Sequence, residues 1–365
     1  MFRYVRFVGN IIAFRWYTPI LIPPNPILTA KDVTVIVPTV EPDGKEFKEC
    51  IESILNNRPA KIIVVTAGKD AYANAVRSTR MYRNIVLINC DVPNKRNQIF
   101  LAPFEDSEDV GCVGTRKRVR RDPSPSGFWS NYWNVLGCLY LERHNFEIVA
   151  TNTIDNGVFV VSGRTSAHRS AILKDPDFMH GFENEYIFFG LVGPLNADDD
   201  NFITRWMVNN QWKIKIQYSD EACIETTLGE YPKFLHQCIR WTRTTWRSNP
   251  RSLISPRVWQ IQWWCIYAVH ISSLFNFAIF YDGTLLYLLT TADDLSISLQ
   301  TGQIALLLWI LCSKVVKTAP HFRRYPRDLV CLPGYILFAY LHSGIKAWAL
   351  LTFWVTTWGS RQQIE

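Results

Sequence analysis

The sequence lacks the features that mark several common classes of protein. None of its nine cysteines forms a C-x-x-C pair, which argues against a disulfide scaffold and a structural zinc site. It contains no N-x-S/T sequon, which fits a chain that faces the cytosol for most of its length. It also has little charge and many apolar residues, 19% and 48% respectively, which excludes a disordered chain.

The sequence does contain long apolar runs near its end. Residues 258–281, 295–313 and 329–345 form charge-free runs of 24, 19 and 17 residues. A helix of about 20 apolar residues crosses the ~30 Å hydrocarbon core of a bilayer. We therefore predict a multi-pass membrane protein with two membrane helices and a third, longer membrane element at about 329–355. Pro333, Gly334 and Gly344 could bend or break that third element.

Flanking charges predict the orientation of these helices. Five arginines between 240 and 257 precede the first run, whereas the turn expected at 282–294 carries aspartates but no Lys or Arg. The positive-inside rule then places residues 31–257 in the cytosol and the turn outside the cell membrane. The third element either crosses once or turns back. Residues 1–30 mix arginines with aromatic residues and predict a helix in the bilayer interface, followed by a Pro-rich linker.

Residues 31–257 alternate short apolar strands with amphipathic helices. Strands are expected at 33–38, 61–66 and 84–88, with helices at 46–55 and 70–80 between them, and further strands at 110–114 and 158–161. This β-α-β order predicts an α/β fold with a parallel sheet and right-handed crossovers. Ligands of such sheets bind at the carboxyl ends of the strands.

Two polar clusters follow those strand ends. Thr39 and Glu41 end the first strand, and Lys95-Arg96 come shortly after the third. A Lys-Arg pair at a ligand edge suits a diphosphate, although such pairs often only solvate a surface.

Two more clusters lie further along the chain. Asp198, Asp199 and Asp200 are adjacent carboxylates. One of them would have a raised pKa if it were partly buried, which suits a general base; the alternative is a solvated turn that caps the helix from Asn201. On a helix, Gln237, Arg240 and Trp241 share one face, where an amide, a fixed cation and a flat ring could hold a pyrophosphate and a sugar.

In this order and before a membrane block, the four clusters resemble the processive family 2 glycosyltransferases, the hyaluronan, chitin and cellulose synthase group. The resemblance is closest to the fungal type 2 glycosyltransferases and covers nearly the whole chain, with Gln237-x-x-Arg240-Trp241 as its most specific motif. It implies a cytosolic GT-A-like nucleotide-sugar domain at 31–257 and a C-terminal block of transmembrane helices at 258–365.

The resemblance also implies roles for individual residues. Asp200 would be the catalytic base beside Asp199, and Gln237, Arg240 and Trp241 would hold the diphosphate and the acceptor. Thr39, Glu41, Lys95 and Arg96 would bind the nucleotide sugar, and Ser162 and Gly163 would line the acceptor site. Trp358-Gly359-Ser360-Arg361 resembles the ending shared by hyaluronan-synthase-like members. A UDP-sugar would be the donor, and a growing extracellular or cell-wall glycan would be the acceptor.

One motif of the family is missing from its expected place. The family holds Mn²⁺ or Mg²⁺ on the diphosphate with a D-x-D at a strand end, a role that suits hard oxygen ligands. Only 13 residues separate Arg96 from Val110, and Asp106 and Asp109 among them lie in a polar stretch without an apolar strand. The metal ligands are therefore unknown, and a few tens of residues look deleted near Ile99–Leu101.

The deletion leaves several interpretations open. The chain is a gene-model or splice variant of an active enzyme, which we favour, or a paralogue that has lost metal binding. The rival functions are a single-transfer lipid glycosyltransferase, such as one acting on ceramide, and a non-catalytic membrane pseudoenzyme.

Residues 116–121 contain five cations in six residues. In a membrane protein we expect these near anionic lipid or the nucleotide rather than on a nucleic acid.

Overall fold

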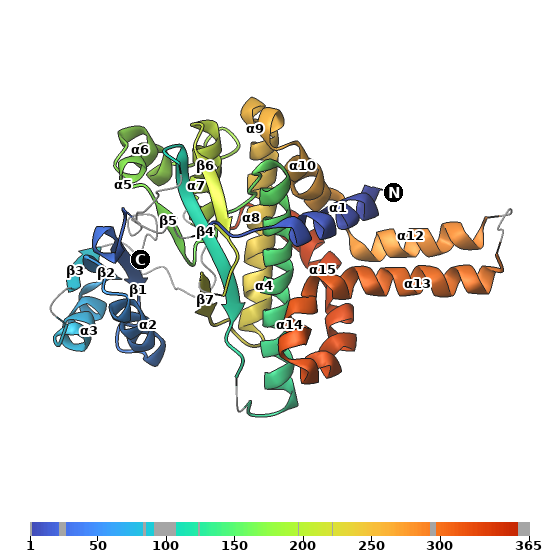
Figure 1. The fold of residues 1–365 in the computed structure, drawn as a ribbon, viewed down its shortest axis with the longest axis horizontal. Coiled ribbons are helices and arrows are strands. Elements are labelled where there is room, and N and C mark those ends of the chain that lie inside the picture. Colours follow the sequence, from blue (N-terminus) through green and yellow to red (C-terminus); the bar gives the residue numbers. More distant parts are fainter. Residues whose placement is uncertain are drawn as a thin grey trace.

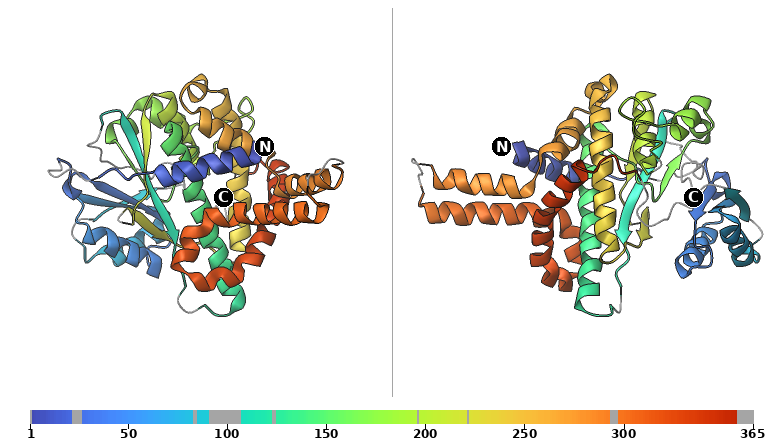
Figure 2. Two further views of the ribbon diagram at one scale, coloured as in Figure 1. Left: turned by 45° about the vertical axis from the view of Figure 1, so that its right-hand side comes forward. Right: turned by 180° about the vertical axis from the view of Figure 1, so that it is seen from behind.

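The fold is taken from a computed structural model of the chain. It describes residues 2–21, 27–82, 85–90, 107–122, 125–195, 197–220, 222–292 and 297–356. Figure 1 shows a small βα unit at one end, a central body of strands and long helices, and a helical hairpin that projects from the other end. Figure 2 shows the same order of parts from two further directions.

The small unit at one end, called here the β1–β3 unit, is a parallel three-stranded sheet with two helices. Its elements are β1 (Thr34–Thr39), α2 (Lys45–Asn56), β2 (Lys61–Ala67), α3 (Lys69–Thr79) and β3 (Ile85–Cys90), after the short helix η1 (Ala30–Asp32). The strand order is β1-β2-β3, and both pairs are parallel. Its core contains Phe47 and Ile51 from α2 against Ile62 and Val64 from β2. The elements predicted for this part are confirmed to within two residues at each end.

The central part, called here the β4 body, is built around one long strand. It contains β4 (Val110–Val119), α4 (Phe128–Asp155), β5 (Ser166–His168), α5 (Ser170–Leu173), α6 (Pro176–Glu183), α7 (Asp199–Asn209), β6 (Lys213–Gln217), β7 (Cys223–Thr226) and α8 (Lys233–Ile254). β4 pairs in parallel with β6 and β7 and antiparallel with β5. The core packs strand residues such as Cys112 and Ile214 against Val149 of α4 and Met207 of α7.

The predicted parallel sheet is present, but it is divided into two pieces. Among the described residues, no strand joins β3 to the sheet that contains β4. Val86 and Ile88 on one face of β3 are 40% and 43% exposed. Parallel sheets normally have both faces covered by helices, so this exposed face is consistent with the predicted loss of residues that follow β3.

The strand predicted at 158–161 is wrong. Val158 and Val161 are both 1% exposed, so the apolar pattern correctly marked buried residues. Their backbone is irregular, however, and the nearest strand is β5. The Val161 N–H donates to the Thr204 hydroxyl at 2.8 Å, so a side chain replaces the strand partner that this amide would otherwise need.

The apolar part of the chain forms helices that differ partly from prediction. They are α9 (Pro256–Ile261), α10 (Trp263–Cys265), the π-helical η3 (Ile266–Ile271), α11 (Ser272–Phe275), α12 (Ala278–Thr290), α13 (Leu299–Val315), η4 (Val316–Thr318), α14 (Ala319–Arg324), η5 (Pro326–Cys331) and α15 (Leu332–Leu350). Two continuous helical stretches, Leu299–Arg324 and Pro326–Leu350, are long and apolar enough to cross a membrane. They correspond to the second and third predicted elements. Gly344 lies inside α15 and does not break it.

The first predicted span is not a single helix. The segment bends by 88° between Trp263–Phe275 and Ala278–Thr290. Asp282, expected in an external turn, lies inside α12 and is 3% exposed. Its carboxylate accepts from Lys314 at 2.7 Å and from Tyr340 at 2.9 Å, and it also pairs with Arg3. Buried partners therefore compensate a charge that the sequence pattern assigned to solvent.

The N-terminal helix α1 (Phe2–Trp16) confirms the helix predicted there, and it crosses α4 (Figure 1). Phe7 and Ala13 are buried at 6% and 2% exposure. An exposed apolar stripe at helical spacing is formed by Val5, Val8, Ile12 and Trp16. Such a stripe suits a bilayer interface, which stays a prediction.

Candidate active site

A cavity with a volume of about 1600 Å³ lies between the β1–β3 unit and the β4 body. Its walls come from β1, β4, the start of α7, one face of α8 and the segment before β5. The predicted site residues that line it are Thr39, Ser162, Gly163, Asp199, Asp200, Gln237, Arg240 and Trp241. The structure therefore brings residues from four separate sequence clusters into one space.

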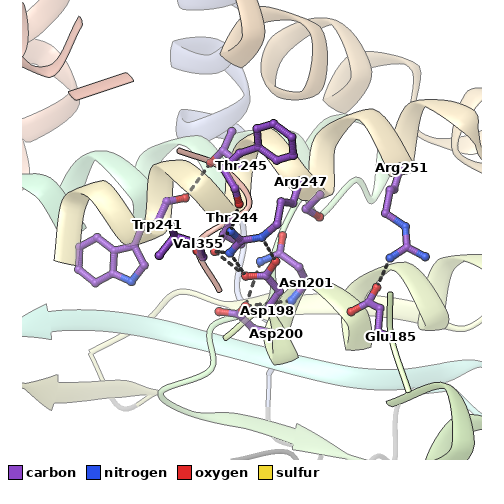
Figure 3. A network of polar contacts seen from close by, with 12 residues as sticks. Glu185, Asp198, Asp200, Asn201, Trp241, Thr244, Thr245, Arg247, Arg251 and Val355 are labelled. Atoms are coloured by element: carbon purple, nitrogen blue, oxygen red, sulfur yellow. Dashed lines mark hydrogen bonds and ion pairs between the residues drawn. The ribbon is translucent and has the colours of Figure 1, made fainter. Parts of the chain in front are cut away.

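The three adjacent aspartates have different surroundings. Asp198 and Arg247, both with side chains 1% exposed, form a two-point ion pair at 2.6 and 2.7 Å (Figure 3). Burial disfavours the charged carboxylate, but Arg247 and the Thr244 hydroxyl lower the pKa of Asp198 below its usual value. Asp198 is therefore an ionised structural group that fixes the start of α7 to α8. It is not the group with a raised pKa that the run of aspartates suggested.

Asp200 faces the cavity and touches the predicted acceptor segment. One carboxylate oxygen accepts from the Gly163 N–H at 3.3 Å, and the other accepts from the Asn201 N–H at 2.9 Å. The Asn201 side-chain amide also donates to it at 2.9 Å. These contacts hold the carboxylate in one orientation at the first turn of α7. An oriented carboxylate at a cavity wall has the geometry that a general base requires.

The helix α8 presents Gln237, Arg240 and Trp241 to the same cavity, as their spacing predicted. Burial lowers the pKa of Arg240, while Asp200, Asp199 and Asp198 act in the opposite direction. The guanidinium thus lies within the electrostatic field of the aspartates across the cavity. The Trp241 ring stacks on Tyr140 of α4, with 5.4 Å between ring centres and 29° between their planes. This stacking fixes the orientation of the indole.

The remaining predicted residues have mixed outcomes. Thr39 lines the cavity, and its hydroxyl accepts from the Glu41 N–H at 3.2 Å. Glu41 is exposed and lies outside the cavity wall. Lys95 and Arg96 lie outside the described residues, as does the motif Trp358-Gly359-Ser360-Arg361.

The sequence reasoning missed a pair on the cavity wall, the buried Lys117 and the half-buried His144. Lys117 is 3% exposed, and its ammonium lies 3.2 Å from Nδ1 of His144. Burial and then Arg164 lower the pKa of Lys117 to about 7, while Asp200 acts the other way. Burial and Lys117 lower the pKa of His144, so the ring is neutral and its Nδ1 can accept. Side chains alternate between the two faces of a strand, so Lys117 points away from Arg116 and Arg118. This alternation could have predicted that Lys117 faces the protein interior.

The cationic run at 116–121 has partners inside the protein rather than forming a lipid-facing surface. Arg116 and Arg118 both pair with Asp220 at 2.8 Å, and Arg120 pairs with Glu49 of α2 at 2.5 Å. Arg121 makes a two-point contact with Asp328 in η5 at 2.7 and 2.8 Å. The run thus ties β4 to α2 and to the apolar helices.

The described residues do not fit a metal site. The resemblance implies a divalent metal ion, but the described part of the chain holds no group of three His, Cys, Asp or Glu residues placed to bind one. Asp109, one of the two candidate acids, pairs with Lys213 and accepts from the Ser107 hydroxyl at 2.5 Å. Asp106 lies outside the described residues.

Comparison with known proteins assigns the family. The family model for glycosyltransferase-like family 2 matches residues 91–244. A type 2 glycosyltransferase of Pyricularia oryzae is 40% identical over 98% of this chain and 80% of its own length, and one of Gibberella zeae is 39% identical over 98% and 74%. An NDP-glycosyltransferase of Aspergillus luteorubrus is 26% identical over 64% of each chain. The chain belongs to the family 2 glycosyltransferases, which transfer sugar from a nucleotide-sugar donor to an acceptor.

The alignments also show internal gaps in this chain relative to the proteins it matches. The match to the Pyricularia oryzae protein runs over 391 positions, whereas 98% of 365 residues is about 358, so about 33 positions have no residue here. The same arithmetic gives about 35 positions for the Gibberella zeae protein. A loss of a few tens of residues was predicted from the missing D-x-D, although the alignments do not locate it.

Proposed function

We propose that this chain is a membrane-embedded synthase that transfers sugar from a UDP-sugar to a growing extracellular or cell-wall glycan. The observation that carries the proposal is the convergence of the predicted base, the α8 face and the predicted acceptor segment on one cavity. That cavity also reaches residues of the apolar part, including Asn276 and Lys346. A sugar-transfer site that opens toward membrane helices suits a product that leaves through or along the bilayer.

In the proposed reaction, Asp200 takes the proton from the acceptor hydroxyl as that oxygen attacks the anomeric carbon of the donor sugar. The bond from the anomeric carbon to the diphosphate oxygen breaks, and the nucleoside diphosphate leaves with the bonding electrons. Arg240 faces the developing negative charge on the diphosphate, and Trp241, with Ser162 and Gly163, positions the acceptor. Thr39 would contact the nucleotide, together with Lys95 and Arg96. No step is assigned to a metal ion.

The membrane arrangement belongs to the same proposal. The cytosolic domain would comprise residues 31–257, the membrane block residues 258–365, and residues 1–30 would lie in the interface. The two apolar helices and the stripe on α1 support this division. Exposed apolar side chains on the hairpin, such as Phe280 and Leu307 at 69% and 51%, support contact with lipid.

A direct test measures incorporation of labelled sugar by membranes that contain the full chain, with UDP-glucose and UDP-N-acetylglucosamine as donors and Mn²⁺ present. We expect Asp200→Asn to lose at least about 100-fold of the rate, as removal of a general base does. Asp177→Asn, which changes an exposed carboxylate on α6, is the matched control and should keep the wild-type rate. Equal rates for both variants would reject Asp200 as the base.

The form of the product separates the alternatives. A long polymer supports the synthase, whereas a single sugar on an extractable lipid supports a ceramide-type glycosyltransferase. A non-catalytic membrane pseudoenzyme is the third alternative, because the D-x-D motif is absent from its expected place in the sequence and the alignment is shortened. Sequencing of the transcript across codons 90–115 tests that possibility. A longer transcript with a D-x-D would identify this chain as a shortened form, and a chain that neither binds UDP nor transfers sugar would be the pseudoenzyme.

A further inference from the structure

The active-site cavity meets a second, smaller cavity of about 130 Å³ next to the apolar helices. The residues that line both cavities come from α1, α4, the break between α11 and α12, and α15: Arg6, Arg143, Glu147, Asn276, His342 and Lys346. We call these six residues the junction. Aromatic rings lead from the predicted site to the junction, because Tyr140 stacks on Trp241 and lies 6.0 Å from the His342 ring.

Positive charge exceeds negative charge at the junction. Arg6, Arg143 and Lys346 line it, and Lys317 contacts its one carboxylate, Glu147, at 2.9 Å. Burial opposes ionisation of Glu147, but Lys317, Arg143 and Arg6 lower its pKa to about 2, so the carboxylate is charged. One carboxylate therefore faces four basic groups, and the two arginines among them keep their charge.

The hydrogen bonds and ring contacts of Arg6, Arg143 and Lys346 are with neutral groups. Arg6 donates to the Ala268 carbonyl at 2.7 Å and to the Ser272 hydroxyl. Lys346 donates to the Asn276 carbonyl at 3.2 Å and lies 4.6 Å from the centre of the Phe277 ring. Arg143 lies 4.8 Å from the centre of the Tyr140 ring. Arginine keeps its charge in proteins, so this excess of cations is costly unless an anion approaches.

The junction also has polar atoms ready for a ligand. Within the described part of the chain, Nε of Arg143, Nε2 of His342 and Oδ1 of Asn276 are buried and have no hydrogen-bond partner. Buried polar atoms normally find a partner. The Nε–H of Arg143 can donate to a ligand oxygen, Oδ1 of Asn276 can accept from a ligand hydroxyl, and Nε2 of His342 can do either, depending on its tautomer. Lys346, only 7% exposed, lies beside them.

We infer that the junction binds a negatively charged group, a carboxylate or a phosphate, on the glycan acceptor or on its lipid carrier. The inference rests on the proposed function, since it names the chemical class of the acceptor for that site. A neutral glycan would leave the cations uncompensated in a site with low dielectric, whereas each anionic group would gain charge-assisted hydrogen bonds from Arg143 and Lys346. The excess charge therefore selects an acidic acceptor over a neutral one of the same size.

The test measures binding of four probes to the full chain purified in detergent micelles. Tetraglucuronate is compared with a neutral glucose tetrasaccharide, and farnesyl phosphate is compared with farnesol. We expect one charged probe to bind at least about tenfold more tightly than its neutral counterpart, the size of a charge-assisted contact. Tighter binding of tetraglucuronate would assign the anion to the glycan, and tighter binding of farnesyl phosphate would assign it to a lipid carrier.

Variants locate the effect at the junction. Lys346→Gln and Arg143→Gln should each remove most of the preference for the charged probe. Lys346→Arg should keep the preference, as should Lys174→Gln, an exposed cation on the surface next to α5. Size-exclusion profiles of all variants report whether they fold. Equal binding of charged and neutral probes, or a preference that survives both Gln variants, would overturn the inference.

The same preparation separates the inference from the proposed function. Sugar transfer is measured with the labelled UDP-sugars used above, and the product is analysed for uronic acid and phosphate. Transfer together with equal binding of the probes would reject the inference and leave the proposed function standing. A charge preference at the junction without any transfer would reject the proposed function instead, while the anion site itself would remain.

Discussion

The β1–β3 unit and the β4 body both form walls of the candidate active site, but they are held together in different ways. The β4 body has an extensive buried core and the enclosed ion pair between Asp198 and Arg247. The β1–β3 unit has a small core of its own, and exposed polar contacts such as Arg120–Glu49 and Thr227–Glu46 join it to the body. The comparison teaches that the predicted base lies in a region with a well-packed core. The region predicted to bind the nucleotide is instead joined to it by exposed polar contacts.

The largest expected effect tests the well-packed region. Arg247→Met should leave Asp198 as a buried charge without its partner and destabilise the protein by about 3–5 kcal/mol. The melting temperature in detergent should fall strongly, and the expression level should fall with it. Arg251→Met, which removes an ion pair with Glu185 from a side chain that is 37% exposed, is the matched control and should have a much smaller effect. Similar melting temperatures for the two variants would contradict this account of the region.

The second prediction tests the small core. Ile51 is 1% exposed in α2, so Ile51→Ala should cost about 2–5 kcal/mol, the range for such truncations. Because the β1–β3 unit has its own core, hydrogen exchange should accelerate in β1 and β2 and stay nearly unchanged in α4 and α8. Faster exchange throughout both regions would mean that they unfold as one unit. Val76→Ala, at an exposed position of α3, is the control.

The third prediction uses the pKa of Lys117, which is about 7 in the folded protein against about 10.4 in an unfolded chain. The unfolded chain binds more protons between these values, so stability should rise with pH from about 7 to 10. Below pH 7 Lys117 is charged in the folded protein, so the free energy of unfolding is lowered by the full cost of burying this cation. Lys117→Met should therefore raise the melting temperature most at low pH and flatten its dependence on pH.

Melting curves of detergent-solubilised protein from pH 6 to 10 measure this difference. Lys174→Met, which replaces an exposed lysine, should keep the wild-type slope. A Lys117→Met slope equal to that of the wild type would show that Lys117 does not titrate in this window.

The smallest expected effect concerns the contact between the two regions. Glu49→Gln removes the charged partner of Arg120, and because Glu49 is a surface group the melting temperature should not change measurably. Hydrogen exchange at the start of α2 should nevertheless become faster, and more so at low salt than at high salt. A large fall in melting temperature would mean that the two regions are joined more firmly than these exposed contacts indicate.

The local structure was largely predictable because it follows from short-range patterns. The strands and helices of the β1–β3 unit followed from alternating and helical patterns, and the two long apolar helices followed from charge-free runs. The irregular backbone at 158–161 could not be predicted. Buried apolar residues give the same sequence pattern whether their amides bond to a neighbouring strand or to a side chain such as Thr204. The bend at Asn276 was also invisible, since the absence of charge says nothing about where a helix breaks.

The sequence by itself determined the order of the elements, the polar clusters and the apolar helices, because these depend on neighbours along the chain. Only the tertiary structure decided which aspartate is a structural partner of Arg247 and which faces the cavity, because burial and charge partners come from distant segments. It also decided that Lys117, His144 and the cations of the junction line the site. The close approach of these charges arises from packing between α1, α4, β4 and α15, and strand alternation could have indicated only the inward direction of Lys117.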